Sequence, residues 1–62
     1  MNGQATPASG IVKVAQAQGR VSVQADCTVD EALVLMQARA DATGHSLIEI
    51  ADAVAAHDIW FN

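Results

Sequence analysis

Two capping boxes fix where this chain starts two of its helices. In Thr28–Glu31 and again in Ser46–Glu49, a hydroxyl residue is followed three positions later by a glutamate. In such a box the hydroxyl oxygen accepts the glutamate's backbone N–H, and the carboxylate accepts the backbone N–H of the hydroxyl residue. Gly44 is of the residue type that most often ends a helix in the left-handed conformation. The boxes therefore predict helices over about residues 29–43 and 47–57.

Apolar residues at helical spacing support these two helices and add a third one before them. The three stripes are Ile11, Val14, Ala15, Val21 and Ala25; then Val29, Ala32, Leu33, Met36 and Ala40; and finally Leu47, Ile50, Ala51 and Val54. The first stripe predicts a helix over about residues 10–25. Val21 and Val23 also suit a β-strand, but no other segment of comparable length offers a partner strand.

Two residues could cap the start of the first helix, and the sequence does not decide between them. Thr6 stands before Pro7, which suits the first helical position, and Ser9 is the competing cap. Residues 1–10 are otherwise small, polar and turn-prone. We therefore expect a leader over residues 1–10, which either stays separate or extends the first helix, and a three-helix domain over residues 11–62.

Small side chains dominate the apolar content, which is 52% of the 62 residues. Thirteen of the apolar residues are alanine and seven are valine. A chain this short buries only ~60% of the surface that its unfolded form exposes, so its stability is small. These proportions suit helices that approach one another closely, and they predict an all-α, compact three-helix bundle.

Charge and composition exclude several classes of protein. The net charge of −4 argues against indiscriminate binding to nucleic acid or to an anionic membrane. One cysteine excludes an internal disulfide framework and a cysteine zinc site. The longest apolar run has five residues, and the N-terminus lacks the pattern of a signal peptide. The sequence thus predicts a cytoplasmic protein.

The residues that most often carry catalysis have simpler structural interpretations here. The spacing of His45 and His57 from each other and from other candidate ligands is not that of a metal site. As a cation, His57 would be favourable near the end of a helix. Cys27 precedes a helix start, which can lower a thiol pKa, but without a nearby base a partly buried turn residue is the better interpretation. Asp30 and Glu31 belong to a first helical turn. We expect no enzyme, no cofactor and no metal.

The three basic residues are candidates for a small RNA contact. Lys13 and Arg20 are seven residues apart and share one face of the first helix, which Gln16 and Gln24 also line. Arg39 lies on the second helix. A solvated helix face is the alternative interpretation.

Three large apolar residues, Val34, Leu35 and Ile48, fall off the predicted stripes. In so small a domain we expect them to contact either a partner chain or the Ile59–Phe61 segment. Because they exceed what three short helices need to cover, they predict a homodimer.

The run from Ala15 to Phe61 resembles the ANTAR domain, the RNA-binding output module of transcription antitermination regulators, in its actinobacterial form. The resemblance covers about three quarters of the chain and depends on the joint spacing of Gln18–Gly19, Glu31–Leu33, Met36, Ala40, Leu47, Ile50–Ala51, Val54 and Ile59–Phe61. It implies a three-helix domain that binds paired hairpins in a leader transcript and prevents a terminator from forming. It also implies a dimer, with a sensor or receiver domain upstream.

The chain departs from the family at three positions that are commonly basic. Gln18 stands in place of a lysine, Gln37 in place of an arginine, and His57–Asp58 where the third helix often ends in arginines. Three missing charges predict weak RNA binding with a shallow salt dependence. The RNA-binding residues that we expect are Lys13, Gln16, Gln18, Arg20, Gln37 and Arg39, with Trp60 and Phe61 as the only aromatics for stacking on loop bases.

The sequence therefore predicts the RNA-binding output domain of an antitermination regulator. The alternative is a degenerate ANTAR domain that serves as a homodimerisation or protein-interaction module, which the negative net charge favours. DNA binding by a helix-turn-helix is disfavoured, because residues 47–57 contain no lysine or arginine to enter a groove.

Overall fold

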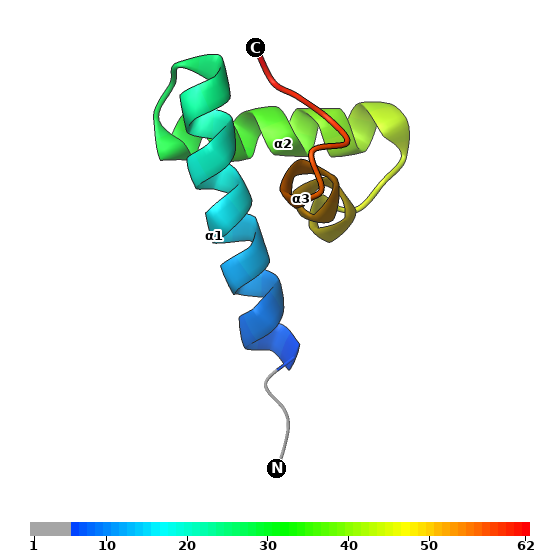
Figure 1. The fold of residues 1–62 in the computed structure, drawn as a ribbon. Helices are drawn as coiled ribbons and strands as arrows, with labels where there is room; N and C mark the ends of the chain where they lie inside the picture. The colour runs from blue at the N-terminus through cyan, green and yellow to red at the C-terminus, as the bar shows by residue number, and fades with distance from the viewer. Residues whose placement is uncertain (1–5) are drawn as a thin grey trace.

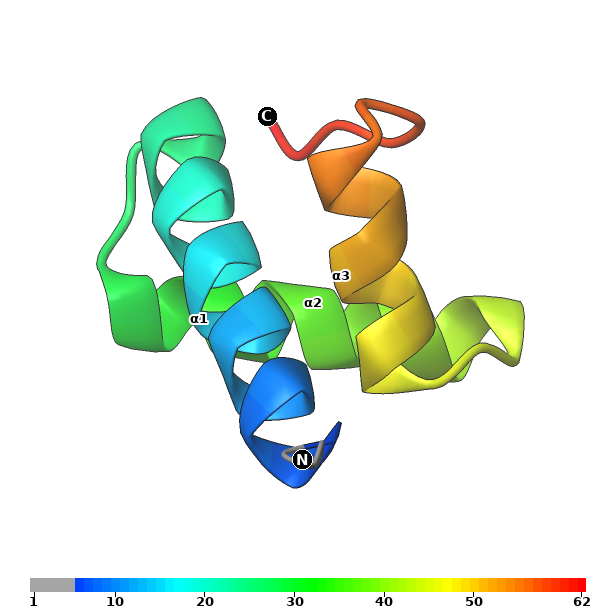
Figure 2. The same cartoon turned by 60° about the horizontal axis from the view of Figure 1, so that its bottom comes forward.

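Three helices make up the described part of the chain, and no strand occurs in it. The computed structural model describes residues 6–62, with side chains from residue 10 onward. The helices are α1 (Thr6–Ala25), α2 (Val29–Thr43) and α3 (Leu47–Ala55), and each packs against the other two. Figure 2 shows α1 and α3 side by side with α2 running crosswise behind them. The all-α prediction is confirmed, and Val21 and Val23 lie inside α1.

The first helix is longer than the sequence predicts. It begins at Thr6, the earlier of the two starts, so part of the expected leader is helical. The proposed Thr6 and Ser9 caps lie outside the described side chains, and residues 1–5 lie outside the described residues. Figure 1 shows the first turns of α1 projecting past α2 and α3.

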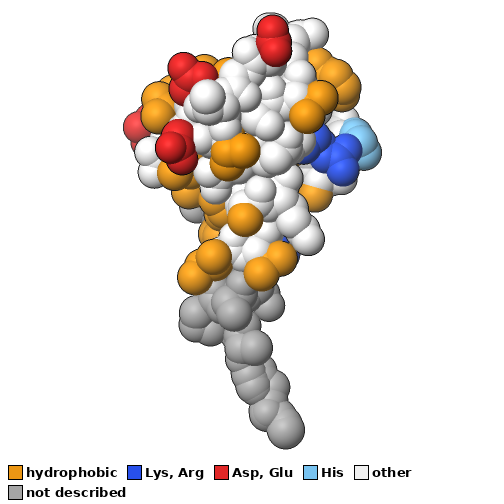
Figure 3. All heavy atoms as spheres, turned by 90° about the vertical axis from the view of Figure 1, so that its left-hand side faces the viewer, with side chains coloured by type: hydrophobic (Ala, Val, Ile, Leu, Met, Phe, Trp, Pro, Cys, Tyr) orange, Lys and Arg blue, Asp and Glu red, His pale blue; other side chains and the backbone are white. Residues whose placement is uncertain are grey.

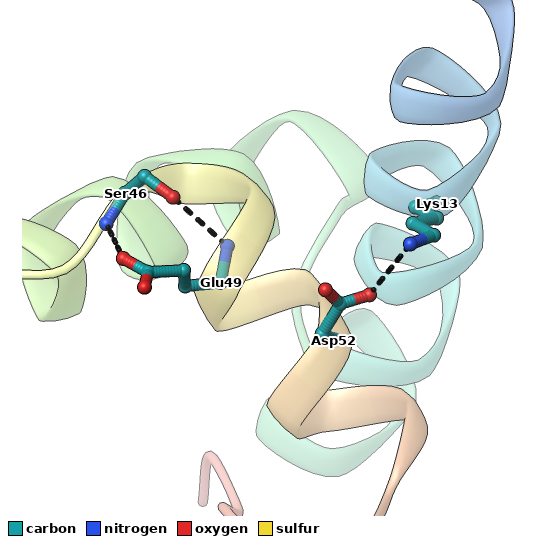
Figure 4. A network of polar contacts seen from close by, with 4 residues as sticks. All are labelled: Lys13, Ser46, Glu49 and Asp52. Carbon is teal, nitrogen blue, oxygen red and sulfur yellow. Dashed lines mark hydrogen bonds and ion pairs between the residues drawn. The ribbon is translucent and has the colours of Figure 1, made fainter. Parts of the chain in front are cut away.

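Both predicted capping boxes are present. Thr28 Oγ1 accepts the Glu31 N–H at 3.0 Å, while Glu31 Oε1 accepts the Thr28 N–H at 2.9 Å. The Ser46–Glu49 box, drawn in Figure 4, has corresponding distances of 3.1 and 2.7 Å. The Ser46 backbone N–H holds the pKa of the Glu49 carboxyl below its ordinary value. The box therefore stabilises α3 fully when the pH is above the pKa of this carboxyl in the unfolded chain. The stabilisation is lost as the pH falls through the lower pKa of the folded chain.

We expect Thr28→Ala and Ser46→Ala each to lower the free energy of unfolding by about 1 kcal/mol, because each leaves a backbone N–H at a helix start without its acceptor. Thr43→Ala is the matched control, since its exposed hydroxyl lies at the end of α2 and caps no helix start. Urea denaturation followed by circular dichroism measures the difference. If the denaturation curves of both capping variants overlay the parent curve, Thr28 and Ser46 do not stabilise the helix starts as N-caps.

All three helices end in the same left-handed turn. Asp26, Gly44 and His57 have φ of 55°, 73° and 61°. In each case the next residue's N–H donates to a carbonyl five positions back, as in Cys27 to Ser22 and Asp58 to Ala53. This is the Schellman arrangement, which satisfies the last free carbonyls of a helix. Glycine is the residue most often found in this conformation, so Gly44 gives the clearest sequence signal of the three. The third helix is predicted to reach about residue 57, and it ends two residues earlier, at Ala55.

Alanines occupy the places where the helices meet. The buried residues are Ala17, Val21, Ala32, Met36, Ala40, Ile50, Ala51, Val54 and Phe61. One-carbon side chains allow the helix axes to approach closely. The expected stripes are only partly right: Ile11 and Ala15 on α1 and Val29 on α2 are exposed, and Ala17 on α1 is buried although the stripe leaves it out. Lys13 pairs with Asp52 on α3, and Arg20 contacts His57 in the turn after α3.

Candidate nucleic-acid interface

Residues 59–62 leave α3 and return between the end of α1 and α2. The Phe61 N–H donates to Gln24 Oε1 on α1 at 3.0 Å. On α2, the guanidinium of Arg39 lies over the Phe61 ring, 4.3 Å from its centroid. Phe61 as a whole is only 6% exposed. Phe61 is thus an anchor that fixes the course of this segment across the bundle.

The turn after α3 brings a histidine against the last basic residue of α1. One guanidinium nitrogen of Arg20 lies 3.0 Å from His57 Nε2 and 3.2 Å from His57 Nδ1. The left-handed backbone at His57 turns the chain back toward α1 at this point. A guanidinium has five N–H donors, so the contact occupies only part of the hydrogen-bonding capacity of Arg20.

Two hollows meet at Asn62. The one against α1, of about 540 Å³, is lined by Arg20, Val23, Gln24, His57, Trp60 and Asn62. The one against α2, of about 330 Å³, is lined by Ala25, Leu35, Arg39, Phe61 and Asn62. We call the residues of these two hollows together the tail surface. Trp60 is 55% exposed there, whereas its neighbour Phe61 is buried. The tail surface thus combines two guanidinium groups with one accessible aromatic ring.

Charge is unevenly distributed over the molecule. Lys13 Nζ lies 3.1 Å from a carboxylate oxygen of Asp52 on α3, as Figure 4 shows. This is the one ion pair within the described residues, so neither Arg20 nor Arg39 has a carboxylate at ion-pair distance there. In Figure 3 a basic side chain lies beside a histidine at one edge of the face shown, away from the acidic side chains. The tail surface therefore keeps positive charge on a protein that is acidic overall.

The six predicted RNA-binding residues do not form one surface. Arg20 and Arg39 both belong to the tail surface, whereas Lys13 lies farther along α1 in its pair with Asp52. Gln18 donates to the Val29 carbonyl at 3.1 Å and, like Gln37, lines a separate groove. Gln16 is exposed on α1.

Sequence reasoning did not include Gln24, His57 or Asn62 in the predicted site. Helical spacing already places Gln24 on the same face of α1 as Lys13 and Arg20, but the predicted set of RNA-binding residues leaves it out. No pattern indicates that His57 turns back to α1, because its left-handed backbone is set by the end of α3.

A second recess, which we call the apolar groove, lies between the first half of α1, the middle of α2 and the start of α3. It measures about 670 Å³ and is lined by Gly10, Ile11, Val14, Ala15, Gln18, Leu33, Gln37, Leu47 and Ile48. No charged side chain lines it. Gly10 permits this junction, because a Cβ there would lie 3.3 Å from Ile48 Cδ1.

Cys27 and His45 lie outside both the tail surface and the apolar groove. Partial burial, then the carboxylates of Glu31 and Asp26, raise the pKa of the Cys27 thiol, which lowers its thiolate fraction and nucleophilicity. His45 hydrogen-bonds Thr43 Oγ1 at 2.9 Å. Over residues 6–62, no cluster of three or more His, Cys, Asp or Glu residues has the geometry to hold a metal ion, and no helix is both long and apolar enough to cross a membrane.

Comparisons of this chain with protein-family models, with curated proteins and with solved structures found no match. The tail surface and the apolar groove are therefore interpreted from their own geometry and chemistry.

Proposed function

We propose that this chain is the RNA-binding output domain of a cytoplasmic antitermination regulator and that the tail surface contacts hairpin leader RNA. The observation that carries the proposal is that Arg20 and the exposed Trp60 line one hollow of the tail surface while Arg39 lines the adjoining one. Neither arginine has a carboxylate partner among the described residues. Phosphates attract unpaired guanidinium groups, and hairpin loops offer unstacked bases to aromatic rings. A sensor or receiver domain upstream belongs to the same proposal.

In this mechanism the two arginines position the RNA and the aromatic ring selects its loop. Arg20 and Arg39 contact phosphates on the two sides of the loop, while a loop base stacks on Trp60. Binding stabilises the antiterminator hairpin and thereby prevents the competing terminator from forming. The acidic remainder of the surface repels further RNA, so the contact stays confined to the loop.

The salt dependence of binding tests this proposal. Because the charge of Lys13 is neutralised by Asp52, we expect each chain to contact two phosphates, through Arg20 and Arg39. The logarithm of the association constant should then fall with the logarithm of the salt concentration with a slope of magnitude about 1.4 to 1.8. Reversal of both charges, Arg20→Glu with Arg39→Glu, is expected to abolish binding to a dual-hairpin RNA. Lys13→Gln is the matched control and is expected to change affinity little.

Far-UV circular dichroism of each variant shows whether the helices are intact. Arg39→Lys keeps the charge and is expected to retain most of the affinity, which separates phosphate neutralisation from the packing of Arg39 on Phe61. Binding that survives the double reversal, or a slope near zero, would refute the proposed role of the arginines.

The apolar groove supports a second candidate function, a homodimerisation module. Ile11 borders the groove and is 71% exposed. The face that carries the groove therefore also carries an apolar side chain that could enter the groove of a second copy. A second copy related by a two-fold axis would place its Ile11 in this groove and receive the first copy's Ile11 in return. Ile48 lines the groove too, whereas Leu35 belongs to the tail surface, so the off-stripe residues do not form one patch.

For this second candidate we expect sedimentation velocity to show a dimer at micromolar concentration. Ile11→Asp is expected to give a monomer, because it adds charge to a groove without a basic side chain. Val23→Asp, at a still more exposed valine near the other end of α1, is expected to leave the dimer intact. A parent chain that sediments at one chain mass throughout the micromolar range would count against the module.

A further inference from the structure

We infer that the hollow beside Trp60 is a binding site for one unpaired guanine base. The inference rests on the proposed RNA-binding function and names the part of the RNA that this surface recognises. Trp60 is the exposed aromatic ring of this hollow, and Val23, the other large apolar side chain lining it, is also exposed. A volume of about 540 Å³ lies within the usual range for small-ligand sites. A planar base therefore finds both room and a stacking partner here.

Arg20 and Gln24 supply side-chain donors to the hollow, and Asn62 adds an amide that can both donate and accept. Gln24 Oε1 already accepts the Phe61 N–H, which fixes the orientation of the amide and leaves its NH₂ group to donate. Arg20 has free N–H donors beyond its contact with His57. No acidic side chain lines the hollow. The ligand edge that fits Arg20 and Gln24 carries adjacent acceptors.

Among the bases, guanine presents such an edge. Its N7 and O6 are neighbouring acceptors, and arginine is their commonest partner. Adenine places an NH₂ donor next to N7, and its usual glutamine partner offers both an acceptor and a donor. In this chain the Phe61 N–H occupies one of the two lone pairs of Gln24 Oε1 and holds the amide so that its NH₂ group remains to donate. The hydrogen bond that anchors the tail thus also sets the base preference.

The chain carries its own probe for the test. It has one tryptophan and no tyrosine, so its intrinsic fluorescence reports on Trp60. The whole chain is titrated with three hairpins that differ at one loop position, which carries guanine, adenine or an abasic sugar. Trp60 quenching and the affinity for each hairpin are both measured. Guanosine monophosphate alone is a fourth ligand.

We expect the guanine hairpin to quench Trp60 and to bind about 5- to 150-fold more tightly than the abasic hairpin. Trp60→Ala should remove this advantage of the guanine hairpin over the abasic hairpin. Gln24→Glu keeps an acceptor for the Phe61 N–H but loses the donor, so the preference for guanine over adenine should disappear. Gln16→Glu, which adds the same charge to an exposed site on α1, should keep the preference.

The outcomes separate this inference from the proposed function. Equal binding of all three hairpins without quenching would overturn the guanine site and leave RNA binding intact. Equal quenching by adenine and guanine would overturn the base assignment. Quenching by guanosine monophosphate without affinity for any hairpin would support the site and overturn the RNA function. No response to any ligand would overturn both.

Discussion

Phe61→Ala is expected to lower the free energy of unfolding by about 3 to 5 kcal/mol. The ring is 6% exposed in the core, and Arg39 covers it from α2. Truncation leaves a cavity and removes the aromatic face that the guanidinium contacts. A domain of 62 residues has a total stability of ~3–9 kcal/mol, so this one change removes much of it. Urea denaturation followed by circular dichroism measures the loss.

Trp60→Ala is the matched control for this prediction. It removes the larger aromatic side chain from the adjacent position, but that side chain is 55% exposed. We expect its free energy of unfolding to stay within about 0.5 kcal/mol of the parent. Equal losses from the two substitutions would show that the segment is not anchored through Phe61. Phe61→Leu is expected to lower the free energy of unfolding by less than about 1.5 kcal/mol. This variant therefore stays folded enough for binding assays.

Met36→Ala is expected to cost about 2 to 5 kcal/mol. Met36 is the largest of the fully buried side chains, with 0% exposure, and a core made largely of alanines has little capacity to fill the cavity that it leaves. The loss is measured by the same urea denaturation.

Val34→Ala, two positions earlier on α2, supplies the comparison. Val34 is 64% exposed, so its truncation removes little buried surface, and alanine is the better helix former. We expect this variant to equal the parent or to be slightly more stable. A Met36→Ala domain as stable as the Val34→Ala domain would mean that the core does not form around Met36.

The sequence predicts helices well wherever the signal is local. The Thr28 and Ser46 boxes and the stop at Gly44 involve residues within a few positions of one another, and all three are present. The predicted end of α3 is two residues late, because a left-handed histidine is a weaker stop signal than glycine. Apolar spacing also fails at Ile11, which is 71% exposed at the border of the apolar groove and not part of the core.

The tail surface is predictable only in part, for a similar reason. Helical spacing correctly places Lys13 and Arg20 on one side of α1. It gives no information on Asp52, 39 residues away, which pairs with Lys13. It also does not reveal that Phe61 brings the end of the chain between Gln24 and Arg39. These arrangements depend on how the helices pack, which the period of one helix does not encode.

The length of α1 has a practical consequence for how this domain is attached to a surface or a reporter. The start of α1 at Thr6 and the residue Asn62 lie at opposite ends of the molecule (Figure 1). An affinity tag or a biosensor linkage joined ahead of α1 therefore leaves the side with Arg20 and Trp60 facing solution. A fluorescent protein fused after Asn62 would stand directly over that side and compete with any ligand for it.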